Sequence, residues 1–166
     1  MLRANKNSQT KAAGRNFAIV ASKYNGRYVD AMVRAARHEL SRAGADSIQV
    51  IRVPGAFEIP VVAATLARSN SDSPESLSAI LCFGVVFQGQ TSHAQHIGWG
   101  VTHALAQIQI QHGVPIIHAV FTFEKEEHAR VRCLGKKHNR GTEAAQTALE
   151  MARVMEAVQS EAATSV

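Results

Sequence analysis

The segment "AILCFGVVF" (79–87) constrains the fold more than any other part of the sequence. All of its residues are apolar or glycine, and the polar residues Ser78 and Gln88 bound it, which is the pattern of a strand that is buried on both faces. Such strands belong to parallel sheets, because the crossovers between parallel strands place helices on both faces of the sheet. The segment therefore predicts an α/β protein with a central parallel sheet.

Strands and helices are expected to alternate along the rest of the chain. Further strands are predicted over 16–22, 47–54 and 115–123, and Gln49 and Arg52 in the second of them are typical of an edge strand. Apolar residues at helical spacing predict helices over 28–43, 56–69, 93–112 and 125–133 and from about 141, with a polar loop over 70–76. Right-handed crossovers then give a three-layer α/β/α sandwich around a four-stranded parallel sheet, with a flavodoxin-like topology.

The 166 residues suit a single domain, which we expect to span 16–160. Residues 1–15 are interpreted either as a flexible N-terminal arm or as a segment that pairs with a neighbouring chain, and 161–166 as a C-terminal tail. Residues 1–15 lack the apolar stretch of a secretory signal. No apolar run reaches the 18 or more residues of a membrane span, so no membrane partner is expected.

The net charge of +5 and the pI of about 9.6 are compatible with an acidic partner. The Lys and Arg residues are scattered, however, which favours a solvated basic surface over nucleic-acid binding and leaves a basic pocket for a small phosphate as a third interpretation. Cys82 and Cys133 form no CxxC motif and have no Cys or His neighbour at metal-ligand spacing. A reduced, cytoplasmic protein without a metal site is therefore expected.

Ligands of open parallel sheets bind beyond the carboxyl ends of the strands. The segment that follows the buried strand, "QGQTSH" (88–93), has the residues of an anion site there. Gly89 allows close approach of the backbone, and Thr91 or Ser92 is expected to cap the next helix, whose first amides attract an anion. His93 would then handle protons beside the bound anion, although a histidine at a helix start is also a common surface residue.

Other polar residues near the strand ends allow two interpretations each. Tyr24 is either a stacking or a packing residue, and Glu58 is either a ligand or a carboxylate favoured by the helix dipole. The stretch 132–141 is either a solvated turn or a phosphate clamp made by Arg132. The motifs GxGxxG, GxxxxGK[ST] and GxSxG are absent, which argues against Rossmann-type redox chemistry, nucleotide hydrolysis and serine-esterase chemistry.

Several stretches, taken together in order and spacing, resemble the lumazine synthase family over residues 16–156. The most specific of them is "VPGAFEIP" (53–60). The others are "GVVFQGQTSH" (84–93), "GVPIIHAVFT" (113–122), "RCLGKKHNRGTEAA" (132–145) and "ALEMA" (148–152).

The resemblance implies a transferase of the penultimate step of riboflavin biosynthesis. That enzyme condenses 5-amino-6-(D-ribitylamino)uracil with 3,4-dihydroxy-2-butanone 4-phosphate to give 6,7-dimethyl-8-(D-ribityl)lumazine. No metal or organic cofactor is implied. The implied partners are these two small-molecule substrates and copies of the same chain in a homopentamer. An icosahedral 60-mer and an association with riboflavin synthase remain open.

The resemblance also implies a role for individual residues. His93 would transfer protons, and Gln90 and Thr91 would hold the phosphate. Two residues, His118 and Arg132, would come from an adjacent subunit, with Arg132 on the phosphate. The remaining implied substrate contacts are Tyr24 stacked on the pyrimidine, Ala56, Phe57 and Glu58 at the pyrimidine and ribityl chain, the backbone of Val85, Val86 and Phe87 at the pyrimidine edge, and Arg140 near both substrates.

The sequence departs from the family pattern at three places. Gln88 stands where an arginine is usual, His118 replaces a phenylalanine, and "LGKKHNRG" (134–141) replaces a turn richer in glycine and alanine. In the family this turn bears on the assembly of pentamers into a shell. Three alternatives stay open: a relative that binds lumazines or flavins without turnover, an unrelated flavodoxin-like regulatory or flavin-binding domain, and a mainly structural shell protein.

Overall fold

The structure is a computed structural model that describes residues 11–70, 76–135 and 138–164. Each predicted strand is present within two residues of its expected ends; the strands are β1 (Asn16–Ser22), β2 (Ser47–Val53), β3 (Leu77–Phe87) and β4 (Ile116–Phe123). The predicted helices are present too: α1 (Gly26–Arg42), α2 (Ile59–Ser69), α3 (His93–His112), α4 (Glu126–Ala129) and α5 (Arg140–Thr164). Two short turns join them, the 3-10 turn η1 (Ala56–Glu58) and the π-helical turn η3 (Arg130–Leu134). Most of the polar loop predicted over 70–76 lies outside the described residues.

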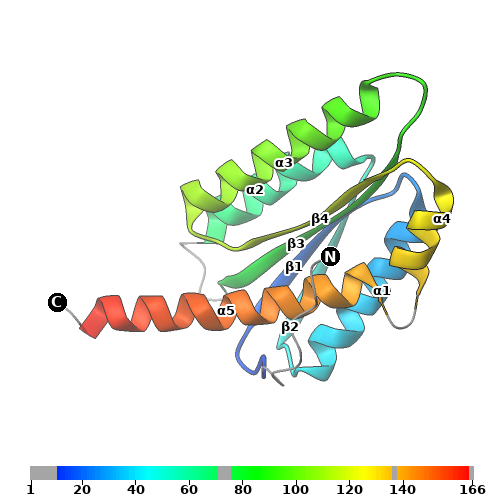
Figure 1. Cartoon of the computed structure of the whole chain (residues 1–166). Helices are drawn as coiled ribbons and strands as arrows, with labels where there is room; N and C mark the ends of the chain where they lie inside the picture. Colours follow the sequence, from blue (N-terminus) through cyan, green and yellow to red (C-terminus); the bar gives the residue numbers. More distant parts are fainter. Residues whose placement is uncertain (1–10, 71–75, 136–137, 165–166) are drawn as a thin grey trace.

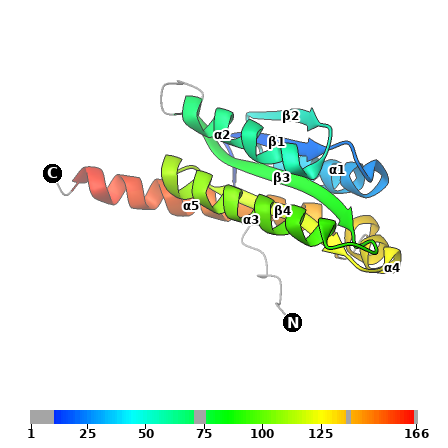
Figure 2. The same cartoon turned by 90° about the horizontal axis from the view of Figure 1, so that it is seen from above.

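The four strands form one parallel sheet in the order β2-β1-β3-β4. Helices α2 and α3 cover one face, and α1 and α5 cover the other (Figure 1). The three-layer α/β/α sandwich predicted from the sequence is thus confirmed, and β2 is an edge strand as its polar residues indicated. Figure 2 shows the sheet from above, with its twist and with α2 and α3 nearer the viewer.

Successive side chains of β3 belong alternately to two hydrophobic cores, one on each face of the sheet. Leu81, Phe83 and Val85 point toward α1 and α5, whereas Ile80 and Cys82 point toward α2 and α3. All five are buried, and burial of a large apolar side chain stabilises the fold by about 1.5–3 kcal/mol. The central position of β3 explains why its sequence is apolar throughout.

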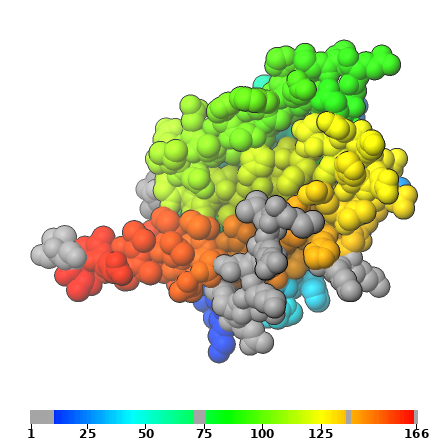
Figure 3. Space-filling view, viewed as in Figure 1, coloured from blue at the N-terminus to red at the C-terminus, as the bar shows by residue number. Residues whose placement is uncertain are grey.

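Strand β4 is not covered on both faces, although most of its residues are apolar. On the side that faces α3, Ile116 and Val120 are buried, but His118 and Thr122 are exposed. The physical reason is the position of β4 at the edge of the sheet, where α3 leaves part of the strand uncovered. Figure 3 shows β4 at the surface between α3 and α5.

Helices α1 and α5 cross at a point where no side chain fits. A Cβ atom at Gly141 would lie 2.0 Å from the carbonyl oxygen of Met32, so the two main chains are in direct contact. Near the start of the domain, Ala12 is fully buried, and the guanidinium of Arg15 bonds to the carboxylate of Glu156 at 2.5 and 2.7 Å. Helix α5 continues past Glu156 and projects beyond the sheet (Figure 1). None of the helices in the described part of the chain is long and apolar enough to span a membrane.

Candidate active site

The carboxyl ends of the strands do not end at one level, because β3 extends further than β1. The extended part of β3 forms the base of the candidate site. The last residue of β3 that pairs with β1 is Phe83, opposite Ala21, whereas β3 continues to Phe87 beside β4. The four residues after Phe83, at about 3.3 Å each, extend β3 about 13 Å past its last pair with β1. The segment Val85–Phe87, expected to contact a ligand through its backbone, is paired with β4 on one edge, and no strand pairs with its other edge, on the side of β1.

The loop after β1 presents an aromatic ring above this base. The backbone amide of Lys23 donates to the Val53 carbonyl at 2.8 Å, and that of Tyr24 donates to the Pro54 carbonyl at 3.2 Å. The backbone of this loop is thus held in place, while the Tyr24 side chain is 75% exposed. A fixed backbone with a free ring suits a face for stacking a planar ligand.

Asn25 is a site residue that the sequence analysis missed. Its backbone is left-handed, with φ of 53°, and its side-chain amide donates to the Val85 carbonyl at 2.7 Å. It thereby joins the Tyr24 loop to the extended end of β3. The available signal was the Asn25–Gly26 pair directly after a strand, since asparagine tolerates this conformation better than most residues.

The turn η1 brings the motif after β2 to the same edge. Ala56 is buried and packs against β3 at Gly84, where a Cβ atom would lie 3.3 Å from the Ala56 Cβ. Phe57 is 60% exposed and lies against α3 beside Gly100. Glu58 is exposed and turns back toward Gly55. A second aromatic ring and a carboxylate therefore stand near the Tyr24 loop.

The segment between β3 and α3 is ordered by its own side chains. The Gln88 side-chain amide donates to the carbonyl oxygens of Thr91 at 2.8 Å and Gly89 at 3.2 Å. The Gln88 backbone amide donates to the carbonyl of Phe123 at 2.9 Å. Gln90 and Thr91 are exposed at the start of α3, as an anion site requires.

His93 is the first residue of α3, and it is exposed beside Thr91. The hydroxyl of Thr91 accepts a long hydrogen bond of 3.4 Å from the His93 amide. Ser92 makes no side-chain cap, so of the two predicted capping residues only Thr91 contacts the helix start. The exposed imidazole is free to reach a ligand bound at this helix start.

Arg132 lies on η3, in the layer that contains α1 and α5, and its side chain is exposed. The turn is tightly built: a Cβ atom at Gly135 would lie 2.5 Å from the Val131 carbonyl oxygen, and Asn139 donates to the Cys133 carbonyl at 2.6 Å. Burial raises the pKa of Cys133 to about 11, although the nearby Arg140 and Arg132 act in the opposite direction. Cys133 is thus an unreactive packing residue beside two guanidinium groups.

Arg140 begins α5 and already has two partners within the chain. Its guanidinium is bonded to the carboxylate of Glu143 and lies over the ring of Phe121, 5.8 Å from the centroid. These contacts fix its position near the carboxyl end of β4. A ligand that reaches Arg140 would meet a guanidinium that is already paired with the Glu143 carboxylate.

The structure separates His118 from the other predicted site residues. His118 pairs with Cys82 in the sheet, five residues before the carboxyl end of β4 at Phe123, which corresponds to about 17 Å along the strand. Its Nε2 atom lies 2.9 Å from the Thr102 hydroxyl on α3. Partial burial of the ring against α3 lowers the pKa of His118 below its ordinary value.

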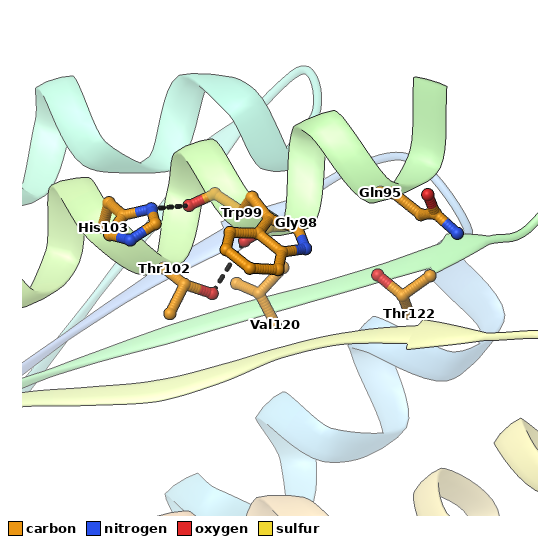
Figure 4. Close-up of a pocket in the computed structure, with 7 residues that line it drawn as sticks. All are labelled: Gln95, Gly98, Trp99, Thr102, His103, Val120 and Thr122. Carbon is orange, nitrogen blue, oxygen red and sulfur yellow. Dashed lines mark hydrogen bonds between the residues drawn. The ribbon is translucent and has the colours of Figure 1, made fainter. Parts of the chain in front are cut away.

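A groove runs along α3 and β4 near His118, and the sequence analysis did not identify it. Its volume is about 410 Å³, and Trp99, which is 70% exposed, forms one wall. Figure 4 shows the residues that line it: Gln95, Gly98, Trp99, Thr102, His103, Val120 and Thr122. The available signal was that Trp99 lies outside the apolar helical repeat of Ile97, Val101 and Leu105, so a large aromatic side chain was to be expected on the outer surface of the helix.

No group of three potential metal ligands occurs within 11–70, 76–135 and 138–164. The arrangement can stack a planar molecule on exposed rings, bind an anion at the start of α3 and move protons through His93. These properties suit a reaction that brings a planar molecule and a small anion together and transfers protons between them.

Comparison with known proteins agrees with this chemistry. The family model described as 6,7-dimethyl-8-ribityllumazine synthase matches residues 14–156. A 6,7-dimethyl-8-ribityllumazine synthase of Xanthomonas oryzae pv. oryzae (strain PXO99A) is 41% identical over 142 residues, which cover 84% of this chain and 89% of that protein. Proteins of the same name from Xanthomonas euvesicatoria pv. vesicatoria (strain 85-10) and Stenotrophomonas maltophilia (strain R551-3) are 40% identical over 142 residues, again 84% of this chain, and 89% and 88% of those proteins.

Proposed function

The chain belongs to the 6,7-dimethyl-8-ribityllumazine synthase family, a transferase of riboflavin biosynthesis, and we propose that its active site lies at the staggered carboxyl end of the sheet. There 5-amino-6-(D-ribitylamino)uracil condenses with 3,4-dihydroxy-2-butanone 4-phosphate. This placement is supported by one observation: Tyr24, η1 and the 88–93 segment all lie around the extended end of β3.

The pyrimidine occupies the space beside the extended end of β3. The exposed rings of Tyr24 and Phe57 offer faces for stacking, and the backbone of Val85–Phe87 offers hydrogen bonds to the pyrimidine edge. Ala56 is buried below this space and closes its floor. The Glu58 carboxylate accepts hydrogen bonds from the hydroxyls of the ribityl chain.

The phosphate of the second substrate lies at the start of α3. The amides there and the side chains of Gln90 and Thr91 surround it with donors, and the helix dipole favours its charge. Arg132, supplied by an adjacent subunit, adds a planar fork that matches phosphate oxygens. Arg140 approaches both substrates while paired with Glu143.

His93 moves the protons of the reaction. The 5-amino group of the pyrimidine attacks the ketone, and water leaves to form an imine; phosphate is then eliminated as a proton is removed, and the ribitylamino nitrogen closes the ring on the remaining carbonyl carbon with loss of a second water. Each step transfers a proton near the phosphate, and His93 at the helix start lies beside that position. Holding the two reactants together supplies the larger share of the rate, since proximity is worth about 7–11 kcal/mol.

The complete site is shared between subunits of a homopentamer. His118 lies about 17 Å along β4 from the carboxyl ends, so it reaches a pyrimidine only in a neighbouring copy. The chain also has two different exposed apolar surfaces, one at Phe57 and Val61 and the other at the Trp99 groove. A contact between unlike surfaces repeats around a ring until it closes, which is the geometry of cyclic assemblies.

A cytoplasmic location completes the proposal. Cys82 and Cys133 are both free and buried, which suits a reducing compartment. Association of pentamers into a 60-mer and contact with riboflavin synthase would involve outer surfaces of the ring, and neither is needed for the chemistry described.

Mixing the purified protein with both substrates tests the proposal. Lumazine fluorescence that grows with time, and that requires both substrates, is the expected result. A protein that binds the pyrimidine or the lumazine without turnover would support the alternative of a binding relative.

A further inference from the structure

Tyr28 on α1 connects two elements of the candidate site that lie far apart in the sequence. Its hydroxyl donates a hydrogen bond to the carboxylate of Glu126, the first residue of α4 and 98 positions further along the chain. The Tyr28 residue is only 4% exposed, so its ring is held by packing. The bond therefore joins α4 to a rigid part of the domain.

The same ring also contacts the end of β3. It packs edge-on against Phe87, with ring centroids 5.7 Å apart and planes at 73°. The guanidinium of Arg27 lies over the Tyr28 ring at 5.7 Å and 3.8 Å from the Glu126 carboxylate. Tyr28 thus contacts the end of β3 through its ring and α4 through its hydroxyl.

Helix α4 leads without a break into η3, which carries Arg132. Glu126 anchors the beginning of this segment. Its end is anchored by the buried Cys133 and by the bond from Asn139 to the Cys133 carbonyl. Arg132 lies between these two anchors with an exposed side chain, so its position depends on both.

We propose that Tyr28 is a positioning residue for Arg132: its hydrogen bond to Glu126 holds the α4–η3 segment so that the guanidinium meets the substrate phosphate. The proposal rests on the phosphate role given above to Arg132. Tyr28 acts through Arg132 and touches neither substrate. This role predicts an effect on the phosphorylated substrate alone.

The test is steady-state kinetics of Tyr28→Phe, which removes the hydroxyl and keeps the ring on Phe87. The KM for the butanone phosphate is expected to rise about 2–10-fold, the effect of one lost hydrogen bond, while the KM for the pyrimidine and kcat stay within twofold. Glu126→Ala should reproduce this rise. Glu126→Gln keeps an acceptor oxygen and should restore most of the affinity, and Glu127→Gln on the same helix is the matched control.

A double-mutant cycle with Arg132→Ala separates this proposal from the proposed function. The phosphate role of Arg132 is measured by Arg132→Ala alone. If Tyr28 acts through Arg132, adding Tyr28→Phe to Arg132→Ala causes no further rise in KM. A full additional rise in the double variant, an unchanged KM in Tyr28→Phe, or equal effects on both substrates would each overturn the positioning role. Unfolding curves of each variant exclude a loss of folded protein as the cause.

Discussion

The Nε2 atom of His118 lies 2.9 Å from Oγ1 of Thr102, and this contact assigns a proton. The Thr102 hydroxyl already donates its one hydrogen to the Gly98 carbonyl at 2.7 Å. It can only accept from His118, so Nε2 carries a hydrogen and Nδ1 of the neutral ring is an acceptor. His118 thus has a hydrogen-bond partner within its own chain.

If His118 contacts the pyrimidine by packing, as we propose, His118→Phe should leave pyrimidine affinity at neutral pH unchanged. Wild-type affinity should weaken as the pH falls through the lowered pKa of His118, because the ring then becomes charged, and the variant should lose that component. Calorimetric titration with the pyrimidine at several pH values measures both effects. A clear loss of affinity at neutral pH in the variant would show that His118 bonds to the substrate.

The same substitution affects stability with a defined sign. The folded-state pKa of His118 is lowered, so the unfolded chain binds more protons between that pKa and about 6.5. The contribution of the neutral ring is therefore complete above pH 6.5 and declines as the pH falls below it. Urea unfolding from pH 7.5 to 5 should show a smaller decline for His118→Phe than for the wild type.

Arg132→Ala should raise the KM for the butanone phosphate far more than the KM for the pyrimidine. A charge-assisted hydrogen bond is worth about 1.5–3 kcal/mol, which corresponds to about 10–150-fold. Arg130→Ala is the matched control, since it removes the same charge from the same turn. Equal effects of Arg132→Ala on both substrates would mean that the residue is structural.

His93→Ala should lower kcat by about 10²–10⁴-fold and leave measurable turnover, because water replaces the imidazole in part and proximity persists. His96→Ala, one turn further along α3 and also exposed, should keep the wild-type rate. Turnover at saturating concentrations of both substrates provides the comparison. A wild-type kcat in His93→Ala would remove this residue from the mechanism.

Trp99→Asp should prevent assembly of the homopentamer. A carboxylate in the α3–β4 groove would have to lose its water when a neighbouring subunit covers it. Light scattering should give a wild-type mass of at least five times the 17.9 kDa chain and a much smaller mass for the variant, with loss of turnover. Ser69→Asp, at an exposed position at the end of α2, is a control for added negative charge. A wild-type protein that is active at the mass of one chain would refute the shared site.

The sequence predicted the layers of the fold because their causes are local. The continuous apolar run of β3 requires cover on both faces, and Gly113, with φ of 65°, ends α3 where the pattern placed its end. The exposed face of β4 was not predicted, because the position of α3 over the sheet depends on the packing of the whole domain.

The site was predictable to the extent that parallel strands end at one edge. Tyr24, η1 and the 88–93 segment could be placed there from their positions after strands. The contacts of Tyr28 with Glu126 and of His118 with Thr102 join residues on different elements, and no periodic pattern records such pairs. Family resemblance supplied individual roles, which the kinetic variants above now test.

The contact between Gly141 and the Met32 carbonyl fixes the crossing of α5 over α1. A crossing set by two backbones does not change when side chains elsewhere along either helix are replaced. Further along α5, buried residues such as Ala148 and Ala152 hold the helix on the core, and Glu156 is paired with Arg15. The direction in which the exposed turns after Glu156 project is therefore set within the domain, and changes in the sequence of those turns leave it unaltered.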